Sequence, residues 1–312
     1  MKPDLTVNIG KLKLKNPVMV ASGTLGEEYG ELIDLNKLGA IVAKTITLHK
    51  RTGNPPPRIV ETPSGMLNSI GLENGGVGYF LAHKLPFLAK LKVPIIVSIA
   101  GQTAKEFSAL VQALRNAKRI DALELNLSCP NVSRRPSSVV RRSYETQMIA
   151  QDEQATAEVI KAVRKTTNKT LIAKLSPNVT DIRKIARAAE DAGADALTVA
   201  NTFLGMAADI ETRRQLLGNV KGGLSGPAIK PLALRLVYET SKTVKIPVIG
   251  SGGIMDWRDA VEFILCGASA VQVGTATFVN PNAAVEIIDG IRTFMVGNKT
   301  RRVEELIGGL RV

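Results

Sequence analysis

The segment Asn126-Leu127-Ser128-Cys129-Pro130-Asn131 holds a thiol between two amides. It follows the apolar-rich run 122–125, which is typical of a buried strand, so Cys129 is expected where a strand opens into a loop. An unperturbed cysteine pKa of about 8.5 allows such a thiol to act as a general base. The segment therefore predicts proton transfer at Cys129, with a simple packing role as the alternative.

The other cysteine and both histidines are expected to be structural. Cys266 falls on the apolar face of a predicted helix, as a small core residue would. His49 and His83 do not lie at strand ends, so a Cys–His nucleophilic pair is not predicted. Two cysteines supply neither a disulfide framework nor a self-contained iron-sulfur cluster, and no metal site is predicted.

Strand-like runs alternate with helix-like runs along the chain, the pattern of parallel strands joined by helical crossovers. Eight such runs predict a single (β/α)8 barrel, the TIM-barrel fold of the α/β class, whose sites lie at the carboxyl ends of the strands. No linker divides residues 1–312, so one domain is expected. The predicted strands are 17–21, 40–44, 94–99, 122–127, 171–174, 196–200, 247–250 and 270–273. The predicted helices are about 80–91, 104–117, 153–166, 181–192, 230–243, 257–266 and 283–295, after a short first crossover at 31–38.

Three long connections remain between these elements, at residues 45–79, 130–152 and 201–229. In a barrel, loops of this length at the carboxyl face usually build the site or a lid over it. We therefore expect long loops to surround the predicted strand ends.

Glycines gather after the last two predicted strands, in Gly250-Ser251-Gly252-Gly253 and in Gly274-Thr275. Glycine lets backbone N–H groups approach an anion closely, and the loops after strands seven and eight are the usual phosphate site of this fold. Each cluster alone is compatible with a tight turn, but the two together favour a bound phosphate.

Lys44 and Lys174 end runs that are otherwise apolar. A buried ammonium is costly unless an anion compensates it, and a reduced flavin, with negative charge around N1 and the C2 carbonyl, is such a partner. The alternative is that either lysine extends to solvent.

Four amides, those of Asn68, Asn126, Asn131 and Asn201, come from three predicted strand-end regions. An amide donates and accepts hydrogen bonds at once, which suits a ring with alternating C=O and N–H groups. Together with the thiol they predict a pocket for a small polar heterocycle, although each asparagine alone is more typical of a turn.

The formal net charge of +13 is spread along the chain, without a basic stripe interleaved with aromatics. A solvated basic surface is therefore favoured over nucleic-acid binding. Neither a secretory signal nor a long apolar span is evident, so a soluble cytoplasmic protein without a membrane anchor is expected.

Five motifs, kept in order over almost the whole chain, resemble class 1 dihydroorotate dehydrogenase, and most closely the class 1B catalytic subunit. A cysteine at position 129 is the class 1 mark, since class 2 enzymes carry serine there. The motifs are Lys44-Thr45, Met66-Leu67-Asn68-Ser69-Ile70-Gly71-Leu72, Asn126 to Val132, Lys174-Leu175-Ser176-Pro177-Asn178-Val179 and Gly222-Gly223-Leu224-Ser225-Gly226-Pro227-Ala228.

The resemblance implies an FMN-dependent oxidoreductase that converts dihydroorotate to orotate in pyrimidine biosynthesis. Cys129 would remove the C5 proton while the C6 hydride passes to flavin N5. The implied substrate residues are Lys44, Asn68, Ser69, Gly71, Leu72, Asn126, Asn131, Asn201 and Thr202. The implied FMN residues are Ala21, Ser22, Lys44, Thr45, Asn126, Lys174, Gly226, Gly252, Gly253, Gly274 and Thr275.

The chain departs from the family pattern after Asn131-Val132. A Gly-rich lid is usual there, whereas this chain has an Arg-rich stretch without glycine at 133–142. We expect an atypical lid at about 130–152, whose arginines either draw in the substrate carboxylate, dock an acidic partner or are simply solvated.

The resemblance leaves the electron acceptor open. In class 1B enzymes a second subunit with FAD and a 2Fe-2S cluster passes electrons to NAD, which implies a heterotetramer. Class 1A enzymes instead reduce fumarate directly. A homodimer or another electron acceptor also stays possible. Two other functions also remain possible. One is a dihydrouridine synthase-like enzyme acting on tRNA, since such enzymes are also FMN barrels with an Asn-x-x-Cys-Pro element. The other is a non-catalytic barrel that binds a phosphorylated ligand.

Overall fold

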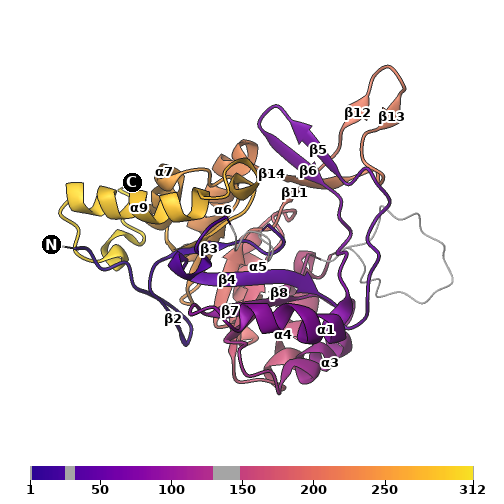
Figure 1. The fold of residues 1–312 in the computed structure, drawn as a ribbon, viewed down its shortest axis with the longest axis horizontal. Helices are drawn as coiled ribbons and strands as arrows, with labels where there is room; N and C mark the ends of the chain where they lie inside the picture. Colours follow the sequence, from indigo (N-terminus) through magenta and orange to yellow (C-terminus); the bar gives the residue numbers. More distant parts are fainter. Residues whose placement is uncertain (1, 25–31, 129–147, 312) are drawn as a thin grey trace.

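The computed structural model describes residues 2–24, 32–128 and 148–311. Within these ranges the chain closes an eight-stranded barrel with strand order β10-β15-β16-β3-β4-β7-β8-β9, every neighbouring pair being parallel (Figure 1). The predicted TIM barrel is confirmed. Its strands are β3 (Val18–Val20), β4 (Ala40–Ile46), β7 (Ile95–Ile99), β8 (Ala122–Asn126), β9 (Thr170–Lys174), β10 (Ala196–Val199), β15 (Val248–Ser251) and β16 (Ala268–Val273).

The barrel strands are buried on both faces because helices cover the outside and side chains fill the inside. β7 is therefore apolar except for Ser98, and every residue of β7 and β9 is buried. All eight strands lie where the sequence predicts them, and the main difference is at β4, which continues past Lys44 to Ile46.

Six long helices surround the barrel, each within three residues of its predicted ends. Several begin with a side chain that caps the first turn: Thr103, Asp152, Asp181 and Asp256 each accept a hydrogen bond from a backbone N–H of the helix that follows. The helices are α3 (Ala104–Leu114), α4 (Glu153–Arg164), α5 (Ile182–Asp191), α6 (Lys230–Ser241), α7 (Trp257–Leu265) and α9 (Ala283–Gly297).

Two crossovers are less regular. Within the described residues the first holds only a 3₁₀ turn, Leu35–Lys37. The helix predicted at 80–91 begins earlier and is divided into α1 (Gly76–Tyr79), a π-helical turn (Phe80–Lys84) and α2 (Leu85–Leu88). Pro86 explains the division, because it has no N–H to donate to the preceding turn.

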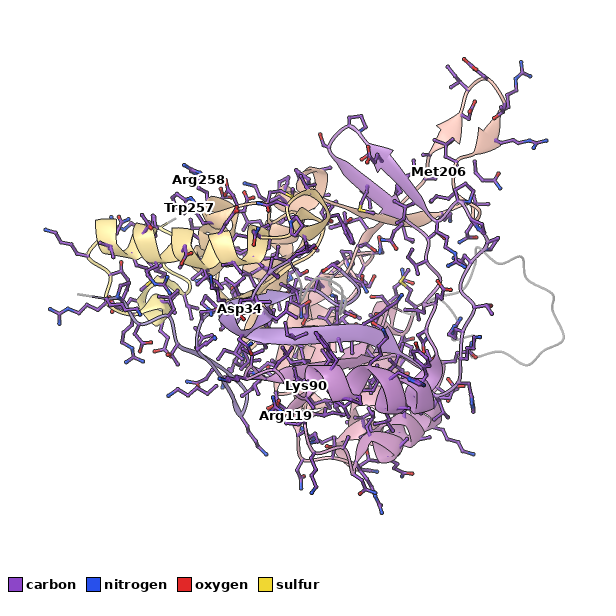
Figure 2. The ribbon with its side chains drawn as sticks, in the orientation of Figure 1. Asp34, Lys90, Arg119, Met206, Trp257 and Arg258 are labelled. Atoms are coloured by element: carbon purple, nitrogen blue, oxygen red, sulfur yellow. The ribbon has the colours of Figure 1, made fainter. Side chains whose placement is uncertain are left out.

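Gly290 allows α9 to pack directly on α7. A Cβ at this position would come within 2.2 Å of Trp257 Cγ, so only glycine accommodates the indole. On the outer side of the indole the Arg258 guanidinium lies 4.5 Å from the ring, and Figure 2 shows the two side chains together on α7.

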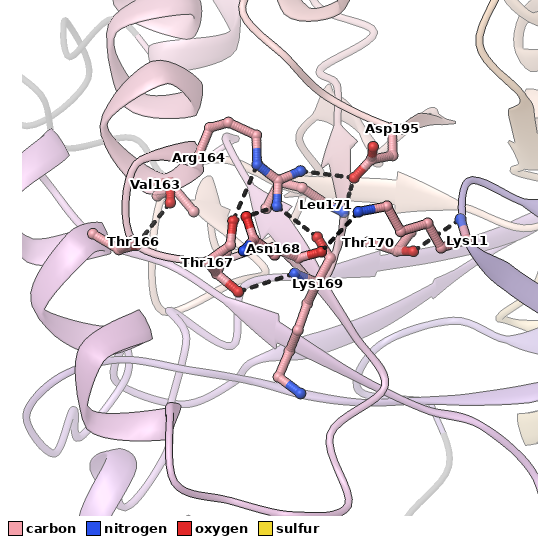
Figure 3. Close-up of polar contacts among 10 residues, drawn as sticks. All are labelled: Lys11, Val163, Arg164, Thr166, Thr167, Asn168, Lys169, Thr170, Leu171 and Asp195. Atoms are coloured by element: carbon pink, nitrogen blue, oxygen red, sulfur yellow. Dashed lines mark hydrogen bonds and ion pairs between the residues drawn. The ribbon is translucent and has the colours of Figure 1, made fainter.

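The amino ends of β9 and β10 are held by a polar cluster shown in Figure 3. Arg164 donates to Asp195 Oδ2 over 2.8 Å, and the same oxygen accepts from the backbone N–H of Leu171. The Thr170 hydroxyl accepts from the backbone N–H of Lys11, in the hairpin of β1 (Val7–Ile9) and β2 (Leu12–Leu14). Polar groups at this end of a barrel serve stability rather than catalysis.

At the opposite end, two of the connections predicted as loops form a sheet. β5 (Ile59–Thr62) and β6 (Gly65–Asn68) come from the connection after β4, and β11 (Phe203–Gly205) and β14 (Gly222–Ser225) from the connection after β10. They pair antiparallel in the order β11-β14-β6-β5, which we call the rim sheet. The long connections predicted at this end of the barrel are confirmed, but their pairing into strands was not predicted, because β11 and β14 are short and β14 begins with two glycines.

A second hairpin, β12 (Ala208–Asp209) with β13 (Arg214–Gln215), extends away from the barrel beyond the rim sheet (Figure 1). No helix in the described ranges is long and apolar enough to span a membrane. The predicted lid residues 130–147 lie outside the described part of the chain.

Candidate active site

A cavity of about 750 Å³ lies between the carboxyl ends of the barrel strands and the rim sheet. Most of the site residues predicted from the sequence line it, although they come from eight separate stretches of chain. Those that line it are Ala21, Ser22, Lys44, Thr45, Asn68, Ser69, Gly71, Leu72, Asn126, Lys174, Asn201, Thr202, Gly252, Gly253, Gly274 and Thr275.

Three predicted residues are not among the described residues that line the cavity. Cys129 and Asn131 lie outside the described residues. Gly226 is positioned behind the wall, where a Cβ would come within 2.7 Å of Gly65 Cα, and its neighbour Ser225 lines the cavity instead. Ser128, which precedes the predicted base, does line it, and its buried hydroxyl has no hydrogen-bond partner among the described residues.

A chain of hydrogen bonds joins the ends of five barrel strands beneath the cavity. Thr45 is at its centre, with its hydroxyl 3.0 Å from Ser22 Oγ and 2.9 Å from Ser98 Oγ. The Asn126 amide donates to Thr45 Oγ1 over 3.4 Å, and Asn201 donates to Asn126 Oδ1 over 3.1 Å. Two of the predicted substrate amides are therefore in contact and held by one network.

Asn68 approaches the cavity from the rim sheet. Its side-chain amide donates to the carbonyl of Gly223, the residue with which it pairs in register. Gly223 has no room for a side chain, since a Cβ would lie 2.1 Å from Thr202 Oγ1. This close approach brings Asn68 to the same wall as Thr202, whose backbone N–H donates to Asn201 Oδ1.

The two predicted lysines differ in their surroundings. Lys174 is 6% exposed and donates to Gln272 Oε1 over 3.2 Å. Lys44 was expected to be enclosed as well, but it is exposed to the cavity and has no hydrogen-bond or ion-pair partner among the described residues. An anion in the cavity would therefore meet an unpaired ammonium.

Sequence reasoning missed two further cations of the wall, Arg51 and Lys221. Both lie in the connections that form the rim sheet, so no strand end marked them. With Lys44 and Lys174 they give the described part of the cavity wall a positive balance, because the one carboxylate among these residues, Glu73, is paired with Arg58. The cavity thus favours anionic ligands.

The glycines after β15 form a turn that no other residue could adopt without strain. Gly252 has φ +125° and Gly253 has φ +80°, and a Cβ at Gly253 would lie 2.6 Å from the backbone nitrogen of Lys230. At Gly274 a Cβ would meet Ala21 Cβ at an ordinary 3.6 Å, so the cavity is open beside it. Exposed backbone at these positions, with the Thr275 hydroxyl nearby, suits a phosphate.

An ion pair supports this turn from behind. Lys230, the first residue of α6, donates to Asp259 Oδ1 over 2.7 Å and lies 3.1 Å from Glu262 Oε2, both on α7. The hydrogen bond to Asp259 raises the pKa of Lys230 above its ordinary value. Cys266, at the end of α7, is 7% exposed and burial raises its thiol pKa, which confirms it as a core residue.

The comparisons with known proteins agree with these features. The sequence model of the family described as dihydroorotate dehydrogenase matches residues 4–295. The chain is 53% identical over 310 residues to the protein of Desulforamulus reducens named dihydroorotate dehydrogenase B (NAD(+)), catalytic subunit. It is 51% identical over 311 residues to the protein of that name from Thermoanaerobacter sp. (strain X514), and 48% to that from Bacteroides thetaiotaomicron. In each case 99% of both chains is covered.

Proposed function

The chain belongs to the dihydroorotate dehydrogenase family, and on that premise we propose that it is the catalytic subunit of an enzyme that passes electrons from dihydroorotate to NAD through a second subunit. It oxidises dihydroorotate to orotate in pyrimidine biosynthesis and is an FMN-dependent oxidoreductase. Membership of this family argues against the two alternatives, a dihydrouridine synthase-like enzyme and a non-catalytic barrel.

The described residues fit FMN. The cavity volume of about 750 Å³ is in the range of cofactor pockets. The left-handed Gly252–Gly253 turn and the open space beside Gly274 would supply a cradle for the phosphate, and Lys174 would supply a fixed cation to the flavin ring. When bound, FMN supplies the hydride acceptor of the reaction, at N5.

The substrate would be held by amides that the barrel holds in place. Asn126 and Asn201 are fixed by their mutual hydrogen bond, and Asn68 reaches the cavity from the rim sheet. They offer donors and acceptors to the ring of dihydroorotate, and the unpaired ammonium of Lys44 attracts its carboxylate. Asn131 is proposed to complete this set.

Cys129 is proposed as the general base that removes the proton from C5 of dihydroorotate. The support is its place in the sequence, directly after Ser128, which lines the cavity, and three residues after Asn126, where β8 ends. A general base works best when its pKa is close to the operating pH, because enough of it is then deprotonated and it still binds the proton well.

The observation that carries this proposal is the meeting of Lys44, Asn68, Asn126 and Asn201 at one cavity in a chain of this family. Anaerobic addition of dihydroorotate to the purified yellow protein tests it. We expect bleaching of the bound flavin and formation of orotate in equal amounts. A flavin that stays oxidised would refute the proposal.

The partner subunit is proposed to carry FAD and a 2Fe-2S cluster. The support is the name of the relatives as catalytic subunits of an NAD-linked enzyme, together with the two cysteines of this chain, too few for a cluster of its own. Reoxidation of the reduced chain by NAD, fumarate and a quinone in turn is the test. Rapid NAD reduction by the chain alone would rule out a two-subunit enzyme.

Several predictions from the sequence remain part of this proposal. They are a single functional domain over residues 1–312, an assembly as a homodimer or a heterotetramer, a cytoplasmic location and an atypical lid at about 130–152. Pairing of β6 with β14 supports the single domain, because it joins segments from both halves of the chain.

A further inference from the structure

One acid and one base are buried inside the barrel. Among the described residues, Glu124 and Lys174 are the only buried carboxylate and ammonium groups, with 0% and 6% exposure. Gln272, 1% exposed, lies between them: its Oε1 accepts from Lys174 Nζ over 3.2 Å, and its Nε2 donates to Glu124 Oε2 over 2.6 Å. A single amide therefore joins the ammonium to the carboxylate.

These residues occupy successive levels of the barrel. Glu124, Thr198 and Gln272 project from β8, β10 and β16, which alternate around the barrel as the strands of one interior layer do. Lys174 pairs in register with Asn126, two residues further toward the carboxyl end than Glu124. Of the four linked side chains only Lys174 lines the cavity.

The orientation of the Gln272 amide follows from its neighbours. An ammonium can only donate and a carboxylate can only accept, so Oε1 must face Lys174 and Nε2 must face Glu124. Reversal of the amide would leave both contacts repulsive. The short 2.6 Å contact at Glu124 agrees with a charged acceptor.

The carboxylate of Glu124 is only partly satisfied by hydrogen bonds. Oε2 accepts from both Gln272 and the Thr198 hydroxyl, the latter over 3.0 Å. Oε1 is buried and has no hydrogen-bond partner among the described residues. A buried charge of this kind depends on a nearby opposite charge, and Lys174 is the one that the barrel provides.

We propose that Glu124 and Gln272 are positioning residues that set how much of the positive charge of Lys174 acts on bound FMN. Glu124 offsets part of that charge from the barrel interior, and Gln272 fixes the position of the ammonium in the cavity wall. The reduction potential of the cofactor is thereby held lower than Lys174 alone would make it. This inference rests on the FMN binding given under the proposed function, since a cation beside the flavin ring stabilises its reduced form.

The test is the equilibrium reduction potential of FMN in the purified holoprotein, measured against reference dyes. Glu124→Gln keeps the size and an accepting oxygen but removes the negative charge. We expect a more positive potential, with at least a tenfold change in the two-electron equilibrium constant, which corresponds to about 30 mV. Glu239→Gln, the same change on the outer helix α6, is the matched control and should leave the potential unaltered.

A second variant tests the direction of the effect independently. Glu124→Gln combined with Gln272→Glu keeps the same two residue types but moves the carboxylate next to Lys174. The potential should then fall below that of the wild type, because the offsetting charge is closer to the ammonium.

An unchanged or lowered potential in Glu124→Gln would overturn the proposal, as would an unchanged or raised potential in the exchanged variant. These outcomes differ from failure of the proposed function, which would appear in the wild type as absence of FMN or as a flavin that dihydroorotate does not reduce.

Discussion

The side-chain amide of Asn201 donates to Asn126 Oδ1 over 3.1 Å, which joins the ends of β10 and β8 at the cavity. Asn126 cannot rotate its amide to suit another partner, because its Oδ1 also accepts from the backbone N–H of Ser128 over 3.3 Å. The ligand-facing groups of both asparagines are therefore fixed before a ligand arrives, which reduces the entropy lost on binding.

Asn201→Asp should weaken substrate binding strongly. It replaces a donor by a carboxylate that faces the half-buried Asn126 oxygen, and a polar group left without its partner costs about 1–3 kcal/mol. We expect KM for dihydroorotate and Kd for orotate to rise roughly tenfold or more, as measured by steady-state kinetics and flavin spectra. Asn298→Asp, at the outer end of α9, is the control. Equal constants for Asn201→Asp and the wild type would contradict the role of this contact.

Cys129→Ala should retain FMN and orotate but reduce its flavin slowly. Loss of a general base costs a factor of ~10²–10⁴ in the step that it assists. Stopped-flow measurement of flavin bleaching by dihydroorotate under anaerobic conditions gives this rate. Cys129→Ser should recover activity over Ala at high pH, where a hydroxyl begins to act as a base. Superimposable pH profiles for the two variants would count against proton transfer at this position.

Gly253→Ala should lower FMN affinity. The residue has φ +80°, and its new Cβ would lie 2.6 Å from the Lys230 nitrogen, so the turn proposed to hold the phosphate must move. We expect purified protein with much less bound FMN and a raised Kd in fluorescence titration. Gly78→Ala is the control, because nothing lies within 4 Å of a Cβ there and alanine favours its helix, α1. FMN content equal to that of the wild type would argue against the cradle.

Lys230→Met should destabilise the protein in a pH-dependent way. The folded pKa of Lys230 is raised by its hydrogen bond to Asp259, so its contribution is fully present below the unfolded value of about 10.4 and is lost as pH rises through the folded pKa. We expect a loss of ~1 kcal/mol in the free energy of unfolding at pH 7 to 9 that shrinks above pH 11. Urea unfolding across this range measures it, and a loss that grows with alkaline pH would contradict the assignment.

The barrel could be predicted from the sequence because its strands are buried on both faces and most of their residues are apolar, as in β7. The cavity residues at strand ends followed from that frame. The rim sheet did not, because Phe203–Gly205 and Gly222–Ser225 are short, rich in glycine and only partly buried, so their pairing depends on the barrel that brings them together. Arg51 and Lys221, which lie in the same connections, were missed for the same reason.

The buried chain of contacts from Lys174 through Gln272 to Glu124 was not predicted either. Glu124 was read as part of an apolar-rich strand, and Gln272 as part of the last strand. A lone polar residue in such a run gives no sign of its partner, because Glu124 and Gln272 are 148 positions apart. Only closure of the barrel brings them to one layer.

The pairing of Asn68 with Gly223 has a consequence for the order of folding. The two residues are 155 positions apart, and four of the eight barrel strands, β7, β8, β9 and β10, lie between them in the chain. Such distant pairing costs chain entropy that is recovered only when the intervening strands are assembled. We expect the cofactor pocket to be the last part of the molecule to mature, so that on refolding the quenching of FMN fluorescence lags behind the recovery of far-ultraviolet circular dichroism. A nascent chain would then acquire its flavin only once it is fully synthesised.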